Sequence, residues 1–140
     1  MQTADVLETV GGLTAQLKAY AAKLPAVVHL TAVPTGVKPK PEAIEDYEGI
    51  VARFRQQSAG TLYKRLNESF VESLEAFEGG KLLASVQPLL AALDHLERMQ
   101  LDKEIEVGRM DEKRMGEYRG VLQKILPGNQ PELDGAGRGL

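Results

Sequence analysis

The segment from Pro41 to Phe77 constrains this chain more than any other part of the sequence. From Ile44 onward its apolar residues recur every three or four positions, and Ser58 fills the one missing step. This spacing places them on one face of an α-helix, which turns once every 3.6 residues. We call this series the stripe, and it comprises Tyr47, Val51, Phe54, Leu62, Leu66, Phe70, Leu74 and Phe77.

Residues typical of helix boundaries mark both ends of the segment. Pro41 suits the first helical position, where its missing N–H is not needed, and Glu42 follows at the positive end of the helix dipole. Gly79 and Gly80 favour a helix stop, because glycine adopts the left-handed cap conformation at little cost. We predict one continuous helix that bends near Gly60. A clean break there is the alternative, since a mid-helix glycine costs about 1 kcal/mol relative to alanine.

An unbroken helix over this segment would run roughly 55 Å at 1.5 Å per residue. A compact chain of this length has a radius of gyration of about 14 Å, so the helix and its stripe should extend past the body unless the helix bends or meets a partner. Charge along the segment is uneven, with a basic middle followed by glutamates. Antiparallel pairing of two copies would match these charges, whereas an ordinary solvated face requires no partner. The basic patch comprises Arg53, Arg55, Lys64 and Arg65.

Shorter helices are predicted on both sides of this segment. The first is capped by Thr3 and runs to about Leu24, with Gly11 and Gly12 marking a loosened turn or the close approach of another helix. The next, Lys81 to about Gln100, is the most apolar, and its short Gly-Gly connection predicts an antiparallel hairpin with the helix before it. Pro88 either kinks this helix or starts a new one.

A last helix is predicted to start at Asp111 and to stop at Pro127. Residues 25–33 are expected to be extended or a short helix, and residues 101–108 are either helical or extended. Residues 34–41 are a proline-rich linker, and residues 129–140 form a flexible tail. We therefore predict one helical domain over residues 1–128.

The composition of the chain excludes several classes of site and function. The chain has 140 residues and no cysteine, which excludes disulfides, zinc–thiolate sites and cysteine nucleophiles. A net charge of −3 argues against a dedicated DNA-binding protein. No apolar run is long enough to span a membrane, and no signal peptide is recognisable. We expect a cytoplasmic protein, or one inside a particle assembled in the cytoplasm, with no membrane partner.

No motif for chemistry stands out. The carboxylates after Pro41 are explained by the helix dipole. Neither His29 nor His95 follows a glutamate by three residues, as the di-iron helical-bundle pattern requires. Ser58 to Gly60 lacks the first glycine of a serine-hydrolase elbow. We therefore expect no catalytic residue, no cofactor and no metal site, and so no enzyme.

These patterns predict an all-α protein, an elongated bundle of four to five helices with one long central helix and a Gly-Gly helical hairpin. The predicted function is a non-enzymatic interaction or assembly protein that forms a homo-oligomer within a larger particle, such as a phage or another macromolecular complex. A small helical adaptor or co-chaperone for one protein partner is an alternative. A nucleic-acid-associated subunit that uses the basic patch is another.

Overall fold

The computed structural model describes residues 1–23 and 38–125, and these ranges are helical, with no strand. The all-α prediction is therefore confirmed for the described part of the chain. The elements in order are α1 (Thr3–Ala22), α2 (Pro41–Ser58), the short 3-10 helix η1 (Leu62–Leu66), α3 (Asn67–Glu78), α4 (Leu82–Leu101) and α5 (Arg109–Ile125).

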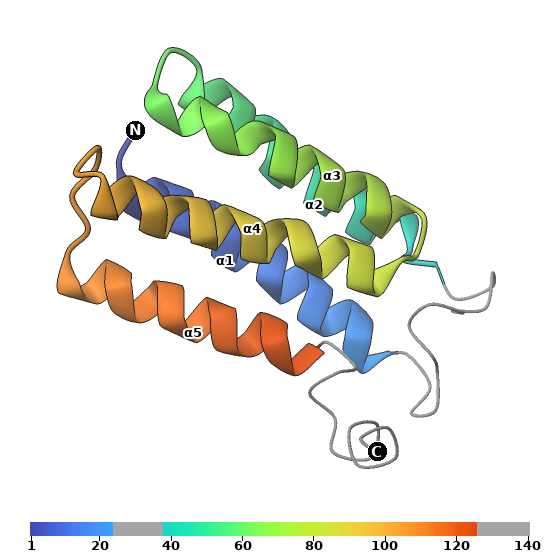
Figure 1. The fold of residues 1–140 in the computed structure, drawn as a ribbon. Helices are drawn as coiled ribbons and strands as arrows, with labels where there is room; N and C mark the ends of the chain where they lie inside the picture. Colours follow the sequence, from blue (N-terminus) through green and yellow to red (C-terminus); the bar gives the residue numbers. More distant parts are fainter. Residues whose placement is uncertain (24–37, 126–140) are drawn as a thin grey trace.

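Helices α1 to α4 pack as a ring, in which each helix contacts the next and α4 returns to α1 (Figure 1). Successive helices run antiparallel, and α5 packs against both α1 and α4, parallel to α1. Helix α1 contacts α2, α4 and α5. Helix α4 likewise contacts three others, α1, α3 and α5, so α1 and α4 occupy the centre of the bundle and the segment from Pro41 to Phe77 does not.

The prediction of a continuous helix from Pro41 to Phe77 is wrong, and the alternative break near Gly60 is correct. Helix α2 ends at Ser58, Gly60 takes a left-handed backbone with φ of 78°, and η1 leads into α3. Thr61 caps η1, because its side-chain oxygen accepts a 3.2 Å hydrogen bond from the backbone N–H of Tyr63. Figure 1 shows that α3 then runs back along α2.

The reversal of chain direction between α2 and α3 explains why the break near Gly60 is more stable than a continuous helix. The two halves of the stripe meet across the hairpin, so that Phe54 and Phe70 pack edge to face at 4.7 Å and Tyr47 stacks on Phe77 at 4.4 Å between ring centroids. Burial of apolar surface stabilises by about 25 cal/mol per Å². A straight helix would leave these aromatic rings exposed, whereas the hairpin buries them in its own chain.

Two glycines let other helices approach α1 closely. A Cβ atom added at Gly11 would lie 2.5 Å from the hydroxyl of Tyr118 on α5, and one added at Gly12 would lie 3.2 Å from Cδ1 of Ile50 on α2. Helix α1 is continuous through both positions. The interpretation of these glycines as a site of close packing is therefore confirmed, and the loosened turn is wrong.

Some predicted helix boundaries need correction. The residue that precedes α1 is Gln2, not Thr3, and its N–H donates a 2.8 Å hydrogen bond to the carboxylate of Asp5. Helix α5 already begins at Arg109, before Asp111. Pro88 lies inside an α4 that is continuous from Leu82 to Leu101.

The connections between the later helices differ in length. Gly79, Gly80 and Lys81 join α3 to α4, which lie side by side, and residues 102–108 join α4 to α5 without helix or strand. The predictions for residues 25–33, for residues 34–37 of the linker and for the tail at 129–140 lie outside the described residues.

Candidate functional site

Most of the stripe is buried inside its own chain. Leu74 is half-buried against the core, and Leu62 is 37% exposed at the turn. The prediction that the stripe extends past a compact body is wrong, because the break at residues 59–61 folds it in two. The stripe residues that are at most 5% exposed are Tyr47, Val51, Phe54, Leu66, Phe70 and Phe77.

The residues of the basic patch are all exposed and lie on both sides of the turn between α2 and α3. Arg53 and Arg55 point in different directions, because two residues are separated by about 200° around a helix. Arg65 forms a 2.9 Å ion pair with Glu104, and this hydrogen bond raises the pKa of Arg65. The structure thus gathers the basic patch at one end of the α2/α3 hairpin, with its members on different faces.

Exposed carboxylates gather at the other end of the same hairpin. The first turns of α2 lie beside the last turns of α3, as the stacking of Tyr47 on Phe77 shows. Lys38, Lys40 and Lys81 are also exposed near this end, but carboxylates outnumber them. We call these carboxylates the acidic end, which comprises Glu42, Glu45, Asp46, Glu72, Glu75 and Glu78.

The acidic end includes an unfavourable charge arrangement. Glu75 and Glu78 lie in the last turn of α3, which contains no basic residue, and there the helix dipole favours cations. The outward surface of the α2/α3 hairpin is therefore negative at one end and positive at the other.

A buried chain of hydroxyl groups joins three helices, and sequence reasoning missed it. The hydroxyl of Ser73 on α3 donates its one proton to the carbonyl oxygen of Ser85 on α4 at 2.7 Å. Ser73 Oγ must therefore accept in its other bond, in which the hydroxyl of Tyr47 on α2 donates. The hydroxyl of Ser85 donates in turn to the carbonyl oxygen of Lys81 at 2.8 Å. Burial raises the pKa of Tyr47. The spacing of Ser73 could have identified it from the sequence. Ser73 lies three residues after Phe70 and therefore on the same side of the helix as the stripe.

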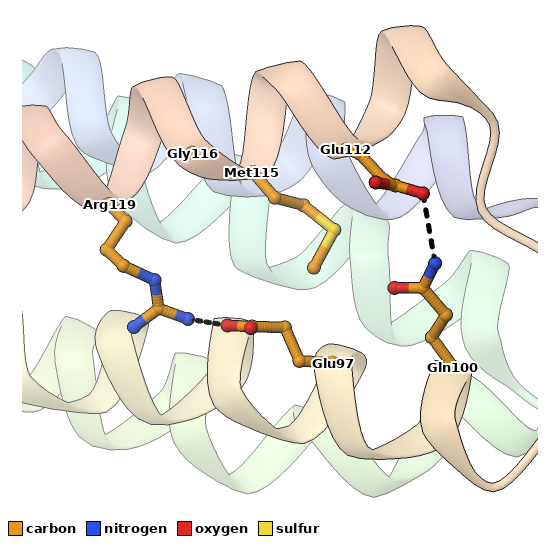
Figure 2. A pocket seen from close by; sticks show the side chains of 6 residues that line it. All are labelled: Glu97, Gln100, Glu112, Met115, Gly116 and Arg119. Atoms are coloured by element: carbon orange, nitrogen blue, oxygen red, sulfur yellow. Dashed lines mark hydrogen bonds and ion pairs between the residues drawn. The ribbon is translucent and has the colours of Figure 1, made fainter.

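A polar seam lies between α4 and α5 and encloses a pocket of about 180 Å³ (Figure 2). Arg119 of α5 forms ion pairs with two residues of α4, Asp94 at 2.8 Å and Glu97. The amide of Gln100 donates a 3.2 Å hydrogen bond to Glu112. The charged groups of the seam thus satisfy one another, and its six lining residues include no serine, histidine or cysteine. This arrangement joins two helices, and its two glutamates are held by Arg119 and Gln100.

Residues 1–23 and 38–125 contain neither a metal site nor a membrane-spanning helix. In these ranges no group of three or more His, Asp or Glu side chains is placed to hold a metal ion. None of the helices there combines the length and apolar character needed to cross a membrane. The charge polarity of the α2/α3 hairpin is a further surface feature of these ranges.

Comparisons with family models, with curated proteins and with solved structures find no match to this chain.

Proposed function

We propose that this chain is a non-enzymatic helical interaction protein that self-associates as a subunit of a larger assembly. The observation that supports the proposal is the charge polarity of the α2/α3 hairpin, with the acidic end at one extremity and the basic patch at the other. Helix α5 packs on α1 and α4, so it covers a different side of the bundle. Among residues 1–23 and 38–125, no helix covers the polar outward surface of α2 and α3.

A second copy of the chain matches this surface. When two hairpins align antiparallel, the basic patch of one faces the acidic end of the other at both ends of the contact. A parallel alignment would place like charges together, which disfavours it. Charge complementarity of this kind steers association and sets orientation more than it adds affinity.

The basic patch supports nucleic-acid binding less well. Phosphate binding draws on cations that act together on one surface. Here Arg53 and Arg55 point in different directions, and Arg65 is paired with Glu104.

The test is the mass of the protein in solution. Light scattering coupled to size exclusion should give a multiple of the 15.3 kDa chain mass, and this mass should decrease as salt screens the charges. A strict monomer at millimolar concentration and low salt would overturn the proposal and favour an adaptor for one other protein. Salt-dependent retention on heparin together with a monomeric mass would favour nucleic acid instead.

A further inference from the structure

We propose that two copies pair through the outward face of α2, antiparallel, about a two-fold axis at Gly49. This inference rests on the proposed self-association and names the surface that carries it. Three observations support it: an exposed glycine that no described neighbour contacts, a charge pattern that is self-complementary about that glycine, and the exposure of the entire face.

The outward face of α2 follows from its helical geometry. Its buried residues, Tyr47, Val51, Phe54 and Ser58, define the side that faces the core. Residues on the opposite side of the helix are all exposed, and Gly49 lies near the centre of that side. We call this set the α2 face, and it comprises Glu42, Glu45, Asp46, Gly49, Ala52, Arg53 and Gln56.

Gly49 lowers the helix propensity of α2, and no described residue packs into the space that it leaves; the same is true of Gly116 and Gly120 on α5, so Gly49 supports the pairing only together with the charges around it. A glycine in the interior of a helix is less favourable than alanine. At Gly11 and Gly12 a side chain of another helix occupies the space where a Cβ atom would lie, but nothing among the described residues lies within 4 Å of that position at Gly49. A second helix that crosses α2 here would approach its backbone closely, and an added methyl group would prevent this.

The charges around Gly49 are complementary under a two-fold axis. In an antiparallel pair centred on Gly49, a residue four positions before it faces the residue four positions after it in the second copy. Glu45 therefore faces Arg53, and symmetry forms this pair twice. Neither side chain has an ion-pair partner among the described residues. Ala52 lies opposite Asp46, and Gln56 lies opposite Glu42, so no like charges meet.

The expected dimer is weak. Exposed ion pairs contribute little each, and the crossing of two helices buries less than the roughly 1,600 Å² of a typical stable interface. We expect a dissociation constant in the micromolar range or above, which increases with salt.

Charge exchange tests the pairing. Glu45→Arg and Arg53→Glu each bring like charges together, so each should raise the dissociation constant at least tenfold in sedimentation equilibrium. The double variant E45R/R53E restores both pairs with reversed signs and should dimerise like the wild type. An equimolar mixture of the two single variants should form a heterodimer. Circular dichroism melting of every variant checks that each one folds.

A matched control uses the same charge change elsewhere on α2. Glu48→Arg alters an exposed residue that lies outside the α2 face, the acidic end and the basic patch, and it should change the dissociation constant less than twofold. Gly49→Ala should raise the melting temperature of the monomer and should also raise the dissociation constant of the dimer. A general loss of stability cannot produce these two opposite effects.

The outcomes separate the two proposals. If the wild type dimerises but charge exchange has no effect, or if the double variant and the mixture stay monomeric, the α2 face is not the interface, while the proposed self-association stands. If the wild type remains monomeric at millimolar concentration and low salt, both proposals are overturned.

Discussion

At the scale of single residues, α3 and α4 end in the same hydrogen-bonding pattern with different residues in the left-handed position. After α3 this residue is Gly80, with φ of 72°, and Lys81 N–H donates to the carbonyl of Ala76 at 2.9 Å. After α4 it is Lys103, with φ of 60°, and Glu104 N–H donates to Met99 at 2.9 Å. A left-handed backbone costs a residue with a Cβ about 1–2 kcal/mol, and glycine avoids this cost.

The first prediction concerns this strain. Lys103→Gly should raise the free energy of unfolding by about 1 kcal/mol, because glycine relieves the left-handed strain and part of that gain is lost to its greater freedom in the unfolded chain. Urea denaturation measures the change. Lys103→Ala, which keeps a Cβ atom, should stay within about 0.5 kcal/mol of the wild type. A less stable glycine variant would contradict the assignment of strain.

The second prediction concerns Tyr47, whose pKa burial raises above the ordinary value of 10.0. Below pH 10 the phenol is protonated in both states. Above that pH the unfolded chain loses the proton first, so stability should decrease as the pH rises above 10. Tyr47→Phe should reduce this decrease, measured by urea denaturation between pH 8 and pH 11. Tyr20 should contribute to the part that remains, because burial also raises its pKa. An unchanged pH dependence in Tyr47→Phe would show that its phenol does not titrate differently in the two states.

At the scale of elements, α5 is attached more weakly than the other long helices. Only Met115 and Leu122 are buried among its 17 residues, whereas α4 buries eight of 20. Its ion pairs with α4 use carboxylates that are 67% exposed at Asp94 and 51% exposed at Glu97, and exposed pairs contribute little stability. Its contact with α1 depends on the space that Gly11 leaves for Tyr118. Local opening is therefore expected to begin with α5.

The third prediction follows from this weak attachment. In native-state hydrogen exchange, the amides of α5 should exchange through a lower-energy opening than those of α1 and α4. Gly11→Ala should increase exchange in α5 more than elsewhere, because the new methyl group meets Tyr118. Gly116→Ala is the control, since a Cβ atom at Gly116 meets nothing within 4 Å. Equal protection in α5 and α1 would mean that all the helices open together.

At the scale of the whole molecule, one hydrophobic core holds the ring of α1 to α4. Helix α1 contributes Leu7, Leu13 and Leu17 to it, all without exposed surface, and α4 contributes Leu89 and Leu96 in the same way. The stripe completes this core from α2 and α3, so it is needed for the fold of each chain and is not left open for a partner. The proposed self-association therefore uses polar surface.

The fourth prediction separates folding from association along the stripe. Leu66→Asp should unfold the protein, because Leu66 has no exposed surface and an unpaired buried charge costs several kcal/mol. Leu62→Asp is the matched control, since Leu62 is 37% exposed, and it should keep the melting temperature within a few degrees. Circular dichroism melting measures both. A folded Leu66→Asp variant would contradict the burial of the stripe.

Local features of this protein could be predicted from its sequence. Helical spacing of apolar residues predicted an all-α chain, since each turn repeats every 3.6 residues whatever it packs against. Pro41 and Gly80 marked helix boundaries, because their backbone preferences act within a few residues. Neither kind of signal depends on contacts between distant parts of the chain.

Tertiary structure alone decided how these helices meet. The stripe has the same spacing in one long helix and in two short ones, so only packing could choose the hairpin that buries Phe54 against Phe70. Gly11 is another example, because the side chain that requires a glycine there is Tyr118, more than a hundred residues away. The hydrogen bond from Tyr47 to Ser73 also depends on packing between helices. Contacts between distant residues depend on which surfaces cover one another, and periodicity along the chain carries no information on that choice.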